Sequence, residues 1–263
     1  MIKIKNLTTK GEIYLYGIIV DDSDAQWLRD EDGNILGYQF PADVKAQLDS
    51  LKGLPIDVHI SSDGGSVSAG IAIANMLAAH DAPTVAYIDS WAASIASVIA
   101  FNCNKIVMPE NTFIMIHNPA GGGMGESSFL RSIADWLDKI RDTIADTYAK
   151  HCGGDIERIK SAMDAETWYT AREASELFDN VEMVEANDVK AVAQIMERGG
   201  IEKLEYSKYN SAPTAIKSKV NNSANDNSAN DNNDAEDVNN DVSNDVKNIL
   251  DKLQRSFNYE EKG

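Results

Sequence analysis

Residues 56–80 read IDVHISSDGGSVSAGIAIANMLAAH, and this stretch decides the fold class of the chain. Ile56–Ile60 is typical of a buried strand, and the apolar residues of Val67–His80 recur at helical spacing. The glycines of Ser61–Ser66 would let backbone N–H groups approach a ligand at a helix N-terminus. The stretch therefore predicts a strand–turn–helix unit that could hold an anion or a developing oxyanion. An ordinary tight turn would give the same pattern, and a P-loop is excluded because no Gly-Lys-Ser/Thr follows.

The same alternation of strand and helix patterns continues on both sides of this unit. Further strands are predicted at Ile13–Gly17, Thr84–Ile88, Lys105–Met108 and Thr112–Ile116, a buried helix at Ala92–Phe101 and a long helix at Gly125–His151. Strands that alternate with helices predict an α/β domain with a largely parallel sheet. Ligand sites of such domains lie at the carboxyl ends of the strands.

The composition excludes several classes of protein. The 263 residues carry a formal net charge of −18, which disfavours binding to nucleic acid or to an anionic membrane surface. The two cysteines provide neither a disulfide framework nor a zinc-ligand set, which is consistent with a reducing cytosol. No apolar stretch approaches the roughly 20 residues that a membrane span needs. We expect an acidic, cytoplasmic protein with no metal, no cofactor, no nucleic acid and no membrane partner.

The last part of the chain has a different composition. NSAND occurs twice in tandem, and residues 210–242 are so rich in Asn, Asp and Ser that we predict a disordered linker there. Residues 243–263 are predicted to form a short amphipathic helix, which would either fold back onto the body or dock on another protein. The body, residues 1–209, is predicted to be one domain.

Three further places in the body could carry chemistry. Ser94 lies in the first turn of the predicted buried helix, where a serine can be a nucleophile and the N–H of Ile95 can help to stabilise an oxyanion. His117 ends an apolar strand, and an acid in Asp164–Ala171 could orient such a histidine. Each has a plainer interpretation: small residues pack helices on sheets, a histidine can be structural, and acids cap helices. Thr170 and Glu173 indeed form a capping-box pattern.

Taken together, these motifs resemble the Clp protease proteolytic subunit family, within the wider crotonase-like fold. The likeness is carried by SDGGSVSAGIAIANML at 62–77, the AAS within Trp91–Ala96, MPENTFIMIHNPAGG at 108–122 and ETWYTAREASELFDNVE at 166–182. It covers about Ile13 to Glu185. More narrowly, ETWYTA resembles the phage head-maturation proteases related to this subunit.

The resemblance implies a fold and a set of roles. The fold would be built from repeated β-β-α units with a long protruding handle helix. Ser94 falls on the family's nucleophile and His117 on its general base. Glu166 falls on its acid, with Asp164 as the alternative. The N–H groups of Gly65 and Ile95 fall on the oxyanion hole.

Three positions depart from the family pattern. Glu166 stands where the family has aspartate, and Asp63 stands where the family usually has proline. Residues 1–12 do not resemble the family's N-terminal axial loops, which argues against docking of a Clp ATPase. By analogy with the family we expect a homo-oligomer of rings, joined through Gly125–His151. The apolar pattern of that helix is equally consistent with packing on its own sheet.

The function implied is a serine endopeptidase that cleaves phage capsid or scaffold protein during head maturation, in the host cytoplasm or the phage prohead. Three alternatives remain open: a degradation subunit fed by an ATPase, a crotonase-type acyl-CoA binding protein, and a catalytically inactive assembly protein.

Overall fold

The computed structural model of this chain describes residues 9–28 and 37–186. The domain boundary at residue 209, the linker at 210–242 and the helix at 243–263 all lie outside the described residues. These three expectations therefore stay predictions.

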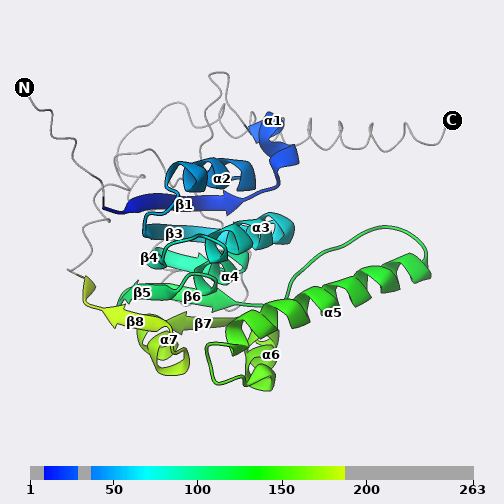
Figure 1. Ribbon diagram of the computed structural model, residues 1–263. Coiled ribbons are helices and arrows are strands. Elements are labelled where there is room, and N and C mark those ends of the chain that lie inside the picture. Colours follow the sequence, from blue (N-terminus) through cyan, green and yellow to red (C-terminus); the bar gives the residue numbers. More distant parts are fainter. Residues whose placement is uncertain (1–8, 29–36, 187–263) are drawn as a thin grey trace, which may run out of the picture. The chain divides into compact units, whose positions relative to one another are not determined.

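An eight-stranded sheet organises the described part of the chain (Figure 1). Its main path runs β2-β1-β3-β4-β5-β8, and β6 pairs with both β4 and β7. Every pair is parallel except β6–β7. The strands are β1 Gly11–Ile19, β2 Tyr38–Gln39, β3 Ile56–Gly65, β4 Thr84–Ala93, β5 Lys105–Pro109, β6 Phe113–Ile116, β7 Thr167–Thr170 and β8 Val181–Val184.

Helices connect most of these strands. They are α1 Ala25–Leu28, α2 Pro41–Ser50, α3 Val67–Ala78, α4 Ile95–Phe101, α5 Ser127–Ala149, α6 Ile156–Asp164 and α7 Ala171–Leu177, with a short 3-10 turn at Asp22–Asp24. The predicted α/β fold class with its parallel sheet and protruding helix is confirmed.

The main hydrophobic core includes α3, α4 and one face of the sheet. Val58 and Ile60 of β3 are fully buried, and they belong to the same cluster as Ile73 of α3. Helices α3 and α4 approach each other closely at Gly70, where a Cβ atom would lie 2.2 Å from Cγ1 of Ile95. Only glycine fits there, so this contact fixes the start of α4, where Ser94 is found.

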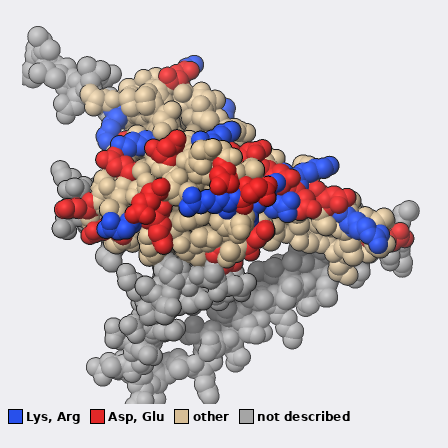
Figure 2. Space-filling view, turned by 90° about the horizontal axis from the view of Figure 1, so that it is seen from below, with Lys and Arg blue, Asp and Glu red and all other residues tan. Residues whose placement is uncertain are grey.

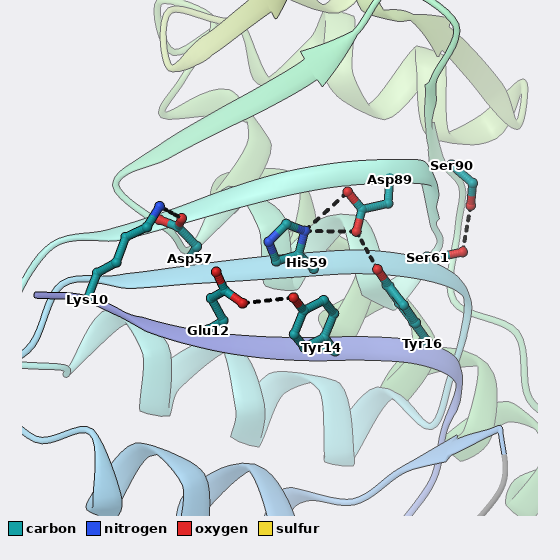
Figure 3. A network of polar contacts seen from close by, with 9 residues as sticks. All are labelled: Lys10, Glu12, Tyr14, Tyr16, Asp57, His59, Ser61, Asp89 and Ser90. Carbon is teal, nitrogen blue, oxygen red and sulfur yellow. Dashed lines mark hydrogen bonds and ion pairs between the residues drawn. The ribbon is translucent and has the colours of Figure 1, made fainter. Parts of the chain in front are cut away.

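The alternate positions of β1, β3 and β4 carry a polar network (Figure 3). The ring of His59 stacks on Tyr14 and on Tyr87, with centroid distances of 4.8 and 5.3 Å. Its Nδ1 lies 2.9 Å from Oδ2 of Asp89, and the hydroxyl of Tyr16 donates to the same oxygen at 2.6 Å. These contacts provide hydrogen-bond partners for the polar groups on this partly buried face of the sheet, as buried polar groups require.

Strand β1 extends two residues beyond the predicted range at each end, and two other strands continue much further than the sequence pattern predicts. β3 runs through the predicted turn to Gly65, and β4 runs through Trp91 to Ala93, so the buried helix begins at Ile95 and not at Ala92. The reason is tertiary: after a register shift, Ser62 still pairs with Ala92. The sequence pattern also did not predict β7, which forms because it pairs with β6 in the antiparallel direction.

Helix α5 is the protruding helix of Figure 1. Near its end, Ile144 and Tyr148 are only 5% and 1% exposed, whereas Phe129 and Trp136 nearer its start are 50% and 62% exposed. The apolar face that the sequence predicts is therefore split: its last turns pack on the body, and its first half stands free. Only the last turns therefore fit the interpretation of a helix packed on its own body, and the subunit interface through the first half stays a prediction.

The surface view adds the charge pattern. Figure 2 shows acidic and basic side chains interspersed over one face of the described molecule. Among the ion pairs of the described residues, Arg141 lies 3.0 Å from Asp138. Within the described ranges, no helix combines the length and the apolar character needed to cross a membrane.

Candidate active site

The structure brings Ser94 and His117 together. Nε2 of His117 lies 2.7 Å from Oγ of Ser94. Ser94 follows β4 directly, His117 follows β6, and these two strands pair in parallel with Ala93 opposite Met115. The Ser94 N–H also donates to the carbonyl of Met115 at 3.0 Å. The register of two neighbouring strands therefore sets the distance between the hydroxyl and the imidazole.

The backbone at Ser94 is strained. Its φ and ψ are 56° and −129°, a region that residues with a Cβ rarely adopt. Among the described non-glycine residues only Ser94 and Glu166, at 50°, have a positive φ. Such strain costs on the order of 1–3 kcal/mol per residue and gathers at functional sites. It falls here on two of the residues that the sequence singled out.

The two candidate acids have different partners. The charge of Glu166 acts on His117 and raises the pKa of the imidazole, partly opposing the lowering that burial causes. Oδ1 of Asp164 instead accepts a hydrogen bond from Nδ2 of Asn118 at 2.8 Å. The electrostatics therefore favour Glu166 over Asp164 as the acid that acts on His117, while Asp164 accepts a hydrogen bond from Asn118, the residue after His117. Sequence reasoning did not single out Asn118.

The predicted oxyanion donors lie at the ends of two elements. Ile95 is the first residue of α4, and the first N–H groups of a helix have no acceptor within it. Gly65 has φ 146°, and a Cβ there would lie 2.0 Å from the carbonyl oxygen of Ile19. The neighbouring Gly64, to which the sequence assigned no role, lies directly against Ser94: a Cβ on Gly64 would be 2.8 Å from Cβ of Ser94.

We expect Gly64→Ala to lower kcat by on the order of 100-fold, because the new methyl group must push Ser94 or its strand aside and small displacements at a reacting centre cost about this much. Gly53→Ala is the matched control. Gly53 also has a positive φ, 80°, but nothing lies within 4 Å of its Cβ position. Steady-state kinetics and thermal unfolding of both variants would check this. Equal loss of activity in the two variants would contradict it.

A pocket adjoins the Ser94–His117 pair. Besides these two residues and Ile95, it is lined by Val67, Val98, Pro119, Ile144 and Tyr148. Its lining combines apolar side chains with the polar groups of Ser94, His117 and Tyr148, as ligand sites with a few placed polar groups do. Among the described residues, no group of three His, Cys, Asp or Glu side chains could hold a metal ion.

Asp63, which departs from the family pattern, also has a defined partner. Its Oδ1 accepts a hydrogen bond from Nε1 of Trp91 at 2.9 Å. The bond joins the carboxyl ends of β3 and β4 just before the glycines and Ser94. It therefore ties the ends of the two strands together through side chains at a position where the family pattern usually has proline.

A second histidine and aspartate lie on the polar sheet face, but without the same geometry. His59 contacts Asp89, whereas the nearby hydroxyls of Ser61 and Ser90 bond to each other at 2.6 Å (Figure 3). No serine hydroxyl is recorded in contact with His59 in the described part of the chain. The Ser94–His117 pair is therefore the better candidate for nucleophilic chemistry.

Comparisons with known proteins identify the family and the fold. Residues 41–183 match the family model described as Clp protease. The ATP-dependent Clp protease proteolytic subunit of Ligilactobacillus salivarius (strain UCC118) is 37% identical over 122 residues, which are 45% of this chain and 61% of that relative's length. A solved structure of a ClpP1 mutant from Listeria monocytogenes is 25% identical, with a TM-score of 0.53 over 67% of this chain and 92% of the other.

Proposed function

The chain belongs to the Clp protease family, and we propose that it is a serine endopeptidase that cleaves peptide bonds through an acyl-enzyme. The observation that carries the proposal is the 2.7 Å contact between Nε2 of His117 and Oγ of the strained Ser94. A serine hydroxyl is a weak nucleophile until a base within hydrogen-bond reach can take its proton.

The steps follow from the positions of these groups. Oγ of Ser94 attacks the carbonyl carbon of the substrate while Nε2 of His117 takes the hydroxyl proton. The N–H groups of Ile95 and Gly65 stabilise the resulting oxyanion, and Glu166 stabilises the imidazolium. When the C–N bond breaks, His117 gives the proton to the departing amine. A water molecule then attacks the acyl-enzyme in the same way, with His117 again taking and returning the proton, and releases the Ser94 hydroxyl.

The electrostatics of His117 suit a base. Burial lowers the pKa of the imidazole from its ordinary value of 6.5, and the charge of Glu166 opposes part of this shift. The imidazole is therefore neutral at neutral pH and can accept a proton. Since it must be neutral to act, activity should rise with pH up to a plateau that begins below the range of an ordinary histidine.

Covalent labelling tests the proposal directly. A fluorophosphonate should modify Ser94 and no other serine, with the adduct located by mass spectrometry of the tryptic peptides. Denatured protein is the control for ordinary serine reactivity. If native protein remains unlabelled at Ser94, the chain is either an acyl-CoA binder or an inactive assembly protein, and the peptidase proposal fails.

The natural substrate is a separate part of the proposal: phage capsid or scaffold protein, cut during head maturation. It rests on the resemblance of ETWYTA at 166–171 to the phage branch. The test offers purified capsid and scaffold protein to the enzyme without ATP and maps the cut sites. A degradation subunit fed by an ATPase is the second candidate, favoured by the name of the relative from Ligilactobacillus salivarius. Cleavage that requires an added unfoldase and ATP would favour it.

We also propose that the protein works as a homo-oligomer of rings. Phe129, Leu130 and Trp136 on the free half of α5 are 45–62% exposed, and Met124 just before the helix is 97% exposed. Large apolar side chains gathered on one exposed element mark an interaction surface. Light scattering of the purified protein would give the number of subunits.

A further inference from the structure

Two buried hydroxyl groups beside the nucleophile have no part in the steps above. Ser97 is fully buried in α4, one turn after Ser94, and Tyr148 is 1% exposed near the end of α5. Their oxygens lie 2.8 Å apart, although 51 positions separate them in the chain. Their contacts form a chain of hydrogen bonds that ends on the backbone of Ser94.

The direction of these bonds follows from counting protons. Oγ of Ser97 donates to the carbonyl oxygen of Ser94 at 2.6 Å. A serine hydroxyl has one proton, so in its contact with Tyr148 it accepts, and the tyrosine hydroxyl donates. Burial raises the pKa of the Tyr148 hydroxyl, which therefore keeps its proton at any pH at which the fold is expected to survive.

The Ser94 carbonyl thus accepts two bonds, because the N–H of Ser97 also donates to it at 3.0 Å. This carbonyl belongs to the same planar peptide unit as the N–H of Ile95. In a trans peptide the two groups point in opposite directions. The hydrogen bonds that hold the Ser94 carbonyl toward Ser97 therefore point the N–H of Ile95 in the opposite direction.

We propose that Ser97 and Tyr148 are positioning residues that hold the Ser94–Ile95 peptide and so aim the Ile95 N–H at the oxyanion. The inference rests on the proposed peptidase function. The two bonds act on a peptide whose first residue is strained at φ 56°, which would relax if the carbonyl were released. Successive hydrogen bonds also polarise one another, so the bonded carbonyl makes the Ile95 N–H a stronger donor.

Kinetics of two conservative variants test this role. Tyr148→Phe keeps the ring that lines the pocket but loses the hydroxyl, and it should lower kcat about three- to tenfold with KM unchanged, the size of one hydrogen bond felt in the transition state. Ser97→Ala should lower kcat by about tenfold or more. In the Ser97→Ala background, Tyr148→Phe should have no further effect on kcat, because the tyrosine acts only through the serine.

Thr112→Val is the control for a merely structural role. Thr112 is 2% exposed, and its hydroxyl also donates to a carbonyl three residues earlier, at 2.7 Å from Pro109 O. The Thr112→Val variant should lower the melting temperature about as much as Ser97→Ala does and leave kcat at the wild-type value. A drop in kcat for Thr112→Val equal to that of Ser97→Ala would overturn the proposal.

Other outcomes separate this inference from the function on which it rests. A rise in KM at constant kcat in Tyr148→Phe would make the tyrosine a specificity residue and overturn the positioning role. Wild-type kcat in both variants, with Ser94 normally labelled by fluorophosphonate in the unmodified protein, would overturn the inference alone. Absence of labelling in the unmodified protein would overturn the proposed function itself.

Discussion

Ser94→Ala should lower the rate of peptide cleavage by on the order of 10⁶, the loss that follows removal of the nucleophile in a serine peptidase of another fold. The effect should fall on kcat, with substrate binding nearly unchanged. The reason is geometric: the hydroxyl that the variant lacks is the group that His117 contacts at 2.7 Å. The measurement is hydrolysis of a fluorogenic peptide, and of capsid and scaffold protein, by wild type and variant prepared in parallel.

Two controls keep this result interpretable. Ser90→Ala removes a nearby hydroxyl that bonds Ser61 and not His117, so it should retain activity. Thermal unfolding should show that Ser94→Ala is folded, because the smaller side chain leaves the backbone hydrogen bond to Met115 in place. Cleavage by Ser94→Ala at the wild-type rate would end the peptidase proposal, whichever substrate is used.

The sequence predicted those parts of the fold that local patterns specify. β1, β3, α3 and β5 have the apolar periodicities of buried strands and helices, and they lie where these periodicities place them. The ends of β3 and β4 could not be found in this way. Ser61–Gly65 looks like a turn because of its glycines, and only the pairing of Ser62 with Ala92 on the next strand makes it part of the sheet.

The candidate site likewise has parts that local sequence patterns predict and parts that depend on contacts between distant segments. The position of His117 at a strand end was visible in the sequence, whereas Ser94 was predicted near the start of the buried helix and in fact directly follows β4. The hydrogen-bond chain from Tyr148 through Ser97 was not visible, because it joins residues 51 positions apart and Tyr148 reads as one more member of an apolar helix face. The position of Gly64 against Ser94 was hidden for a similar reason: two adjacent glycines give no local sign of which one approaches a side chain.

The choice between the two acids has the second large expected effect. Glu166→Gln should lower kcat by about 10⁴, because a neutral amide neither stabilises the imidazolium nor holds the productive tautomer of His117. Asp164→Asn, the matched control, changes a carboxylate that accepts from Asn118, and an amide oxygen can still accept that bond. Its kcat should stay within about tenfold of wild type, the limit for one exposed hydrogen bond.

The pH profile distinguishes an electrostatic role of Glu166 from a loss of structure. The negative charge of Glu166 raises the pKa of His117, whereas burial lowers it. Removing the charge leaves burial unopposed, so the pKa falls further. Activity depends on neutral His117, and the acid limb of kcat/KM in Glu166→Gln should therefore move to lower pH while the plateau drops. An acid limb that stays in place, or a larger loss in Asp164→Asn, would transfer the role of the acid to Asp164.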